Sequence, residues 1–381
     1  MSKQNHPLKN IIYPLPLDSH GYTGLTNLGN TCFLNSCIQV INHIYELTPI
    51  YETTFIANKK NDTIDTFFFD EWISLHLFMW KKDGVISPMR FVQTVQHVAN
   101  TKQRELFTGF SQNDIHEFIL LFIDTLHMSI SRKMDITITG TVKNDLDELA
   151  VKCYSYLQRV YKNEYSEILG LFYGITVSKI ISLDTPIVTL STTPEHFFIL
   201  DLPIPSFTNM DERPMFSKSS MELQSKSPEC SLYDCLDLFT KEERLEGENA
   251  WFNEITGRKE AINKKIEFWN FPEILVISLK RFSASGNHKR NDMVNFPLKS
   301  LDLSRYVCGY CPNKYVYDLF GVCNHYGGCN GGHYTATVLN YLEEWVIYND
   351  GIVERTSTNI VTPSAYCLFY RMKKTGFQDM T

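Results

Sequence analysis

A cysteine at the start of a helix is the residue of this 381-residue chain that is best placed for nucleophilic chemistry. In the stretch GYTGLTNLGNTCFLNS, residues 21–36, a glycine-punctuated turn gives way at Cys32 to apolar residues with helical spacing. Free backbone N–H groups and the positive end of the helix dipole favour a thiolate over a thiol. The position therefore predicts a depressed pKa for the Cys32 thiol.

A base for this thiol is available near the carboxyl end of the chain. An imidazole must take and return the proton, and an acceptor must fix the imidazole's tautomer. In NGGHYTATVLNYLEEWVIYNDGIV, residues 330–353, two antiparallel strands joined by a turn over 340–344 would bring His333 beside Asn349. Asp350 is a second candidate orienter, although strand alternation predicts it on the opposite face.

The residues around this histidine leave alternatives open. Gly331 and Gly332 lack a Cβ, so a substrate backbone has room to pass close to His333. His325, eight residues earlier, is the competing base, but no orienting group lies in its adjacent strand pattern. A single histidine at a strand end is more often structural.

A donor for the oxyanion of an acyl-transfer transition state is also needed. Asn27, five residues before Cys32, can offer its side-chain amide beside the Cys32 backbone N–H. The alternative is that Asn27 serves only the geometry of the glycine-rich turn.

A second cluster of polar residues opens the helical pattern SQNDIHEFILLFIDTLHMSI, residues 111–130. Ser111 and Asp114 have the spacing of a capping box, which predicts that the helix starts there. Asp114 and Glu117 are then neighbours on the face opposite the apolar stripe. The alternative is a solvated face with one capping carboxylate.

The elements that must position these residues change in kind along the chain. Helical patterns dominate up to about residue 170, and short β-branched or aromatic runs follow, which predicts an α+β fold with a mostly antiparallel sheet. Residues 1–20 are expected to form an arm, 206–229 a mobile insertion and 374–381 a tail. No linker separates independent domains, so we expect one multi-lobed domain, 21–373.

Composition excludes several classes of function. The chain is 43% hydrophobic and 21% charged with a formal net charge of −7, and it has no basic block of the kind that tracks nucleic acid. No signal peptide or long apolar run is present, so we expect a location in the cytosol or nucleus and no membrane partner. We also expect no nucleic-acid partner and a monomer. The ten cysteines are expected to be free thiols.

Four boxes together carry a family resemblance. TGLTNLGNTCFLNS, FTGFSQNDIHEFI, PEILVISLKRF, and YDLFGVCNHYGGCNGGHYTATV with EEWVIYNDGIVE occur in this order, and residues 22–372 resemble the ubiquitin-specific protease family of deubiquitinases. The resemblance implies a papain-like cysteine peptidase fold with a helical thumb (about 21–165), fingers (about 166–270) and a palm (about 271–373). It also implies that a cleft between thumb and palm takes the tail of ubiquitin.

The resemblance implies a role for each site residue. It makes Cys32 the nucleophile, His333 the general base and acid, Asn349 its orienter and Asn27 the oxyanion donor, with Asp350 assisting. The implied partners are ubiquitin and ubiquitinated proteins. The residues implied to line the tail channel are Asp114, Glu117, Gln112, Gly331 and Gly332, flanked by loops 282–296 and 324–333.

The chain departs from the family at the fingers. Many members bind a structural zinc there through two Cys-x-x-Cys pairs, but the corresponding segments ISLDTPIVTLST and WFNEITGRKEA contain no cysteine. We therefore expect no metal and no cofactor. Cys308 and Cys311 form a Cys-x-x-Cys elsewhere, for which free thiols are the simpler interpretation. Alternative functions are an inactive ubiquitin-binding module or a protease for a ubiquitin-like modifier.

Overall fold

The architecture comes from a computed structural model that describes residues 21–109, 111–183, 186–205, 229–283, 288–329, 331–357 and 359–374. The arm predicted for residues 1–20 lies outside this part of the chain. So do all but the last residue of the insertion predicted for 206–229 and all but the first of the tail predicted for 374–381.

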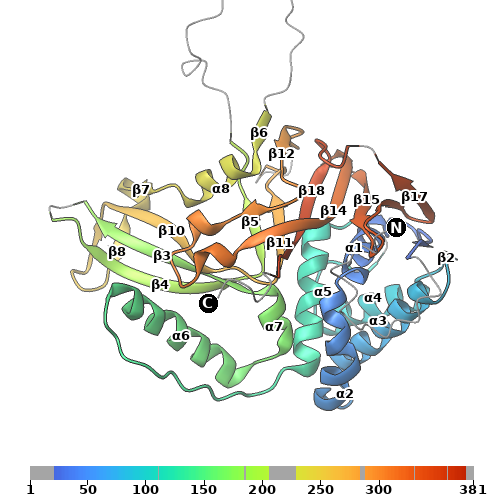
Figure 1. Ribbon diagram of the computed structural model, residues 1–381, viewed down its shortest axis with the longest axis horizontal. Helices are drawn as coiled ribbons and strands as arrows, with labels where there is room; N and C mark the ends of the chain where they lie inside the picture. Colours follow the sequence, from blue (N-terminus) through green and yellow to red (C-terminus); the bar gives the residue numbers. More distant parts are fainter. Residues whose placement is uncertain are drawn as a thin grey trace, which may run out of the picture.

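The amino-terminal half is a helical lobe, at the right and bottom of Figure 1. Side-chain caps define several helix starts: Thr63 accepts from the Thr66 backbone N–H, and Asn144 from that of Asp147. The helices are α1 (Cys32–Asn42), α2 (Phe55–Asn58), α3 (Ile64–Lys81), α4 (Met89–Thr101), α5 (Ile115–Ile130), α6 (Asp145–Asn163) and α7 (Glu167–Phe172), with a 3-10 turn (Tyr45–Leu47) and a π turn (Ile50–Thr54) between α1 and α2.

Helix α1 is the centre of the fold, because every one of its residues is buried. It packs against α5 on one side and against the strands that carry the histidine and asparagine on the other. Its polar side chains are bonded rather than solvated: Gln39 donates to the Thr23 carbonyl at 2.8 Å, and Asn42 pairs with His76 at 2.7 Å. A helix buried on all sides is held rigidly, which fixes the position of its first residue.

The carboxyl-terminal half forms a large, mostly antiparallel sheet. Its strand order is β17-β16-β15-β14-β18-β11-β5, with β13 beside β14; among these described strands β5 alone runs parallel to its neighbour, β11. The strands are β5 (Ile199–Leu202), β11 (Ile274–Leu279), β13 (Leu301–Asp302), β14 (Val316–Gly328), β15 (Gly331–Leu339), β16 (Trp345–Asn349), β17 (Ile352–Thr356) and β18 (Ala365–Met372). Every residue of β11 is buried, as expected for a central strand covered on both faces.

A smaller sheet extends away from the helical lobe, at the left of Figure 1. Its order is β4-β3-β10-β7, formed by β3 (Gly174–Ser182), β4 (Thr189–Phe197), β7 (Glu243–Leu245) and β10 (Ile262–Asn270). The hairpin of β8 (Trp251–Asn253) and β9 (Arg258–Glu260) lies at its tip. Helices α6 and α8 (Leu232–Thr240) lie on either side of the sheet (Figure 1).

Short strand pairs and 3-10 turns complete the fold. The pairs are β1 (Thr23–Leu25) with β2 (Gly84–Ile86) and β6 (Glu229–Ser231) with β12 (Met293–Asn295); the 3-10 turns are Gly247–Asn249, Ser304–Tyr306 and Pro312–Lys314. In the described part of the chain, no helix combines the length and apolar character needed to cross a bilayer. β5 pairs with the large sheet although it lies within the range expected for the fingers.

Two histidines buried beside α1 make the stability of the fold depend on pH. Burial lowers the pKa of His43 to about 4 and that of His76 to about 3. Both side chains are therefore neutral in the folded state at pH 6.5, whereas in the unfolded state they take up protons below about pH 6.5. The contribution of these two histidines to the free energy of unfolding is therefore complete above that pH and is lost as the pH falls toward 4.

We expect the free energy of unfolding, measured in urea, to fall between pH 6.5 and 4.5 by up to about 1.4 kcal/mol per pH unit for each of these histidines. His76→Gln should flatten this slope. His97→Gln, at an exposed position on α4, is the matched control and should keep the wild-type slope. Equal slopes for His76→Gln and wild type would contradict the prediction.

Candidate active site

Cys32 is the first residue of α1, as the sequence predicted, and its side chain is buried. The backbone of Tyr334, the residue after His333, makes a hydrogen bond to the thiol that favours its ionised form. The predicted depression of the pKa is nevertheless wrong. Burial raises the pKa of Cys32, and the nearby Asp350 carboxylate adds to the rise; together they outweigh backbone bonds from Tyr334 and Phe33.

His333 and Asn349 come together as the strand pattern predicted. They lie on the neighbouring antiparallel strands β15 and β16, whose connection is closed by the Asn340 N–H donating to the Glu344 carbonyl at 3.0 Å. His333 Nε2 is 2.6 Å from Asn349 Oδ1. Because an amide oxygen only accepts, this contact selects the tautomer of the neutral imidazole that has its proton on Nε2 and its lone pair on Nδ1.

Asp350 also reaches this histidine, contrary to the alternation argument. Its backbone has φ 51°, the left-handed region, so the strand geometry ends at Asn349 and the next side chain returns to the same side. The Asp350 Oδ2 atom lies 4.0 Å from His333 Nε2. Both candidate orienters therefore face one nitrogen.

The Asp350 carboxylate also joins two asparagines of the cysteine segment. Asn27 Nδ2 donates to Oδ2 at 3.0 Å, and Asn35 Nδ2 donates to Oδ1 at 2.7 Å. Asn35, one turn after Cys32 on α1, was missed by the sequence analysis. Its signal was a polar residue within a helix predicted from apolar spacing, one turn after Cys32.

Asn27 has both of the roles that the sequence left open. Its Oδ1 accepts from the backbone N–H groups of Gly29 at 3.0 Å and Thr31 at 3.2 Å, which shapes the turn before Cys32. Its amide nitrogen carries two hydrogens, of which the bond to Asp350 uses one. The side chain is thus fixed in place while one N–H stays available.

The two segments also interlock through their backbones. The Leu25 N–H donates to the Asp350 carbonyl at 2.9 Å. A Cβ on Gly24 would lie 2.6 Å from the Gly351 carbonyl oxygen, so only glycine permits this approach. The turn after β16 is therefore seated directly on the segment that leads to Cys32.

Gly332 serves packing rather than only substrate access. A Cβ there would overlap the Nε2 atom of His325 and the carbonyl oxygen of Tyr326, whereas one on Gly331 would meet only Gln112 Oε1 at 3.6 Å. The expectation that both glycines leave open room is therefore wrong for Gly332, because the ring of His325 fills that space.

His325, the competing base, is a buried residue of β14. Only 5% of its surface is exposed, and burial lowers its pKa to about 4, helped by Lys289. Its ring packs against Phe282 and Tyr334. In the described residues its Nδ1 has no hydrogen-bond partner, in contrast to the contact between His333 and Asn349.

Gln112 bridges the helical lobe and the large sheet at this point. Its Nε2 donates to the Gly332 carbonyl at 3.0 Å, and its Oε1 accepts from the Gly332 N–H at 3.0 Å. This reciprocal pair is the one that a neighbouring strand would make, and it occupies the edge of β15 beside His333.

Asp114 itself caps α5, which begins at Ile115 rather than at the predicted Ser111. Its carboxylate accepts from the His116 backbone N–H at 2.7 Å and from the Tyr366 hydroxyl at 2.9 Å. Burial raises the pKa of Asp114 despite these bonds. The capping box is wrong because Asp114, being nearer the helix, satisfies its free N–H groups.

The acidic face contains one more carboxylate than the sequence analysis identified. His116 Nε2 lies 3.2 Å from Asp201 Oδ1, and His116 Nδ1 lies 3.7 Å from Glu117 Oε1. Burial disfavours the charged form of His116. The carboxylates of Asp201, Asp114 and Glu117 outweigh this effect, so the pKa of His116 is raised. Asp201 was missed because β5 is remote in sequence and gives no local sign of pairing with α5.

Lys289 ties together the two loops expected to flank the channel. Its buried ammonium donates to the carbonyls of His325 at 2.7 Å and Gly327 at 3.2 Å. Residues 284–287 and 330 of these loops lie outside the described part of the chain. The strand end that leads to His333 is therefore held from the side by a charge-assisted contact.

The fingertip residues do not suit a zinc ion. The described hairpin β8–β9 offers the Asn253 amide, the Thr256 hydroxyl and the Glu260 carboxylate, and these bond to one another. No cluster of three or more histidine, cysteine or acidic side chains suited to a metal occurs in the described residues. Absence of metal stays a prediction. The ten cysteines are free thiols, as expected. Cys37, Cys153, Cys235 and Cys367 are buried, while Cys308 is half-buried and Cys311 exposed.

Comparison with known proteins places the chain in a family. The model of the ubiquitin carboxyl-terminal hydrolase family matches residues 23–370, so the chain belongs to that family. Ubiquitin carboxyl-terminal hydrolase 2 of Bos taurus is 33% identical over 365 residues, covering 93% of this chain and 55% of that protein. Hydrolase 21 of Homo sapiens is 32% identical over 381 residues, covering 92% and 62%.

The extent of the match differs among relatives. The chain spans little more than half the length of the first of these relatives. Hydrolase 2 of Gallus gallus, at 31% identity over 373 residues, is covered to 96% of its own length and covers 94% of this chain. The match thus extends over nearly the whole length of that relative.

Solved structures show the same fold. The SAGA Ubp8/Sgf11/Sus1/Sgf73 DUB module bound to ubiquitin aldehyde matches with a TM-score of 0.66 at 23% identity, covering 93% of this chain and 70% of that chain. The module bound to monoubiquitin gives the same TM-score and coverage at 22% identity. The predicted α+β fold is confirmed.

The packing of Gly332 against His325 predicts a difference between two neighbouring glycines. Gly332→Ala should lower the free energy of unfolding by about 1–3 kcal/mol, because a backbone carbonyl and a buried ring must both move. Gly331→Ala, the matched control, should stay within about 0.5 kcal/mol of wild type. Urea denaturation measures both; equal losses would contradict the packing argument.

The charge of Asp350 predicts a shift in the reactivity of Cys32. Because this carboxylate raises the pKa of the thiol, Asp350→Asn should move the pH profile of Cys32 alkylation to lower pH. Asparagine also tolerates the left-handed backbone at this position. Alkylation by iodoacetamide is followed by mass spectrometry of the Cys32 peptide.

Asp302→Asn, in β13 beside the opposite end of β14, is the control and should leave the profile in place. A profile for Asp350→Asn that is unchanged or moved to higher pH would show that Asp350 does not control the thiol.

Proposed function

We propose that this chain is a deubiquitinase, a thiol hydrolase that cleaves the bond after the C-terminal glycine of ubiquitin. The observation that carries the proposal is that Cys32 lies beside the strand that bears His333, at the junction of α1 and the large sheet. Cys32 begins the buried helix beside Tyr334, and the adjacent His333 is oriented by Asn349 at 2.6 Å. Membership of the ubiquitin carboxyl-terminal hydrolase family supports it.

In the proposed reaction the Cys32 sulfur attacks the carbonyl carbon of the terminal glycine while its proton passes to His333 Nδ1. Because burial keeps the resting thiol protonated, proton transfer accompanies the attack. His333 then gives this proton to the departing lysine amine as the C–N bond breaks, and a thioester remains. Water loses a proton to the imidazole and attacks the thioester, which releases the ubiquitin carboxylate and restores the thiol.

The oxyanion of both steps needs donors near the sulfur. We infer that the Cys32 backbone N–H and the second amide hydrogen of Asn27 serve this purpose. Support comes from the way that Asn27 is held by the turn and by Asp350, since a donor fixed before reaction does not have to reorganise during it. Asp350 is then a positioning residue that links this donor to the histidine.

The ubiquitin tail is proposed to run between α5 and the large sheet toward Cys32. Asp114, Glu117 and Asp201 form an acidic surface at the start of α5, which suits arginines of a basic tail. A substrate strand that enters beside β15 would take over the backbone bonds that Gln112 makes to Gly332. Gly331 then provides close approach without a Cβ.

An assay of ubiquitin hydrolysis and binding also tests two alternative functions. A catalytically silent ubiquitin-binding module would bind without turnover, and a protease for a ubiquitin-like modifier would act on a different substrate. The nucleophile, base, orienter and oxyanion donor of the proposed reaction are all residue types competent for those roles: Cys32, His333, Asn349 and Asn27. This favours an active enzyme. The cytosolic or nuclear location and the monomeric state stay predictions.

Cys32→Ala should abolish hydrolysis of a fluorogenic ubiquitin C-terminal amide while retaining ubiquitin binding and the wild-type unfolding midpoint, because only the nucleophile is lost. Cys311→Ala, which removes an exposed thiol, is the matched control and should keep full activity. Unchanged hydrolysis by Cys32→Ala would refute the assignment. Binding without hydrolysis by the wild type would favour the silent module, and hydrolysis of a ubiquitin-like substrate alone would favour the other protease.

A further inference from the structure

A second concave site lies on the helical lobe away from Cys32. A cavity of about 690 Å³ opens where α5, α6 and α7 meet the bases of β3, β4 and β10. This volume is in the range of pockets that bind small molecules, and such pockets often lie between packing units. Asp114, the N-cap of α5 near the candidate active site, and Asp124, on α5 at this cavity, are ten residues apart, which corresponds to roughly 15 Å along the helix.

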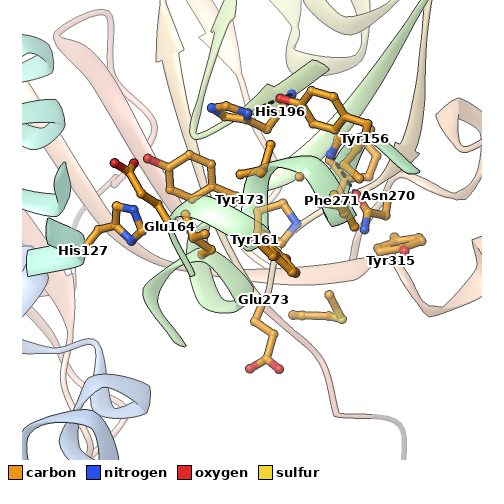
Figure 2. Close-up of a pocket in the computed structure, with 18 of the residues that line it drawn as sticks. His127, Tyr156, Tyr161, Glu164, Tyr173, His196, Asn270, Phe271, Glu273 and Tyr315 are labelled. Carbon is orange, nitrogen blue, oxygen red and sulfur yellow. Dashed lines mark hydrogen bonds between the residues drawn. The ribbon is translucent and has the colours of Figure 1, made fainter. Parts of the chain in front are cut away.

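The walls of the cavity are aromatic. Tyr156 and Tyr161 from α6, Tyr173 after α7, and Phe271 and Tyr315 from the sheet side line it, and Figure 2 shows these rings arranged around one space. At the rim, the Lys314 ammonium lies over the Tyr315 ring, 4.9 Å from its centroid. One ring face here thus already holds a cation, a geometry that aromatic rings favour electrostatically.

The charges around the rings are mainly negative. Asp124, Glu164 and Glu273 line the cavity, against Lys314 as the lining residue with a permanent positive charge. The Oδ2 atom of Asp124 forms ion pairs with Lys102 Nζ at 3.5 Å and with Arg104 Nη2 at 3.7 Å. In the described part of the chain the carboxylates of Glu164 and Glu273 have no ion-pair or hydrogen-bond partner.

Glu164 is the carboxylate best placed to act inside the cavity. Figure 2 shows it turned toward His127 and Tyr173, whereas Glu273 points away from the other labelled side chains. Burial lowers the pKa of His127 and of His196, so both are neutral near pH 7 and do not compensate the acid. The exposed Glu164 carboxylate therefore faces aromatic walls with no cationic histidine to offset it.

The backbone adds to this negative potential. The lining residue Asn163 is the last residue of α6, so the cavity borders the carboxyl-terminal turn of that helix. Leu169 and Gly170 of the short helix α7 line it as well. The last carbonyls of a helix present partial negative charge. Cations are favoured there, and anions are not.

From the aromatic walls, the unpaired Glu164 and the helix end, we propose that this cavity binds an aliphatic amine: an ammonium group on an apolar stem. The stem packs on Tyr161 and Tyr173, and the ammonium pairs with Glu164. The source is either a free diamine or polyamine, or a lysine side chain presented by a peptide. The proposal does not depend on the hydrolase assignment.

Isothermal titration calorimetry on the full chain tests the proposal with three probes: diaminooctane, its uncharged analogue octanediol, and a lysine-containing tripeptide with blocked ends. We expect saturable binding of the diamine and much weaker binding of the diol. Glu164→Gln keeps the shape and removes the charge, and it should weaken diamine binding by about fivefold or more. Glu148→Gln, on the exposed surface of α6, should stay within about twofold of wild type.

The results distinguish a lysine side chain from a free amine as the ligand, and they can also overturn the proposal. Tripeptide binding comparable to that of the diamine would identify a lysine side chain as the ligand, and weaker binding a free amine. Tyr173→Leu should also weaken diamine binding while hydrolysis of a ubiquitin substrate is unchanged. Absence of saturable amine binding, equal binding of diol and diamine, or equal losses in Glu164→Gln and Glu148→Gln would overturn the proposal.

Discussion

The candidate active site depends on the contact between the turn that follows β16 and the segment that leads into α1. Asp350 adopts a left-handed backbone at the end of β16, and its carboxylate bonds Asn27 and Asn35 while it lies 4.0 Å from His333 Nε2. Its carbonyl accepts from Leu25, and the neighbouring Gly351 contacts Gly24. Segments more than 300 residues apart are thereby held in a single arrangement.

Burial explains both the rigidity of this arrangement and its resting chemistry. A helix covered on every side cannot shift its first residue without disturbing the core, so Cys32 has a defined position. The same burial removes water from the thiol and disfavours its charge, and the Asp350 carboxylate adds to the effect. Asp350, which fixes the geometry, thus also adds to the effect of burial in disfavouring the thiolate of Cys32.

The local elements followed from the sequence because their signals are local. The helix at Cys32, the hairpin that pairs His333 with Asn349, and the change from helices to strands depend on residue spacing, which sequence displays directly. The predictions that failed needed knowledge of remote neighbours. The cap of α5, the side on which Asp350 lies and the room at Gly332 were each decided by contacts or backbone angles that no local pattern encodes.

The sequence by itself determined the chemical inventory: a cysteine at a helix start, a histidine and an asparagine at adjoining strand ends, and an acidic helix start. Only the tertiary structure decided which groups share one site and in what state they rest. Asp201, Asn35 and Lys289 joined it through pairings between elements distant in sequence. The pKa of Cys32 changed direction for the same physical reason: spacing sets what a side chain is, but burial and neighbouring charge set how readily it ionises.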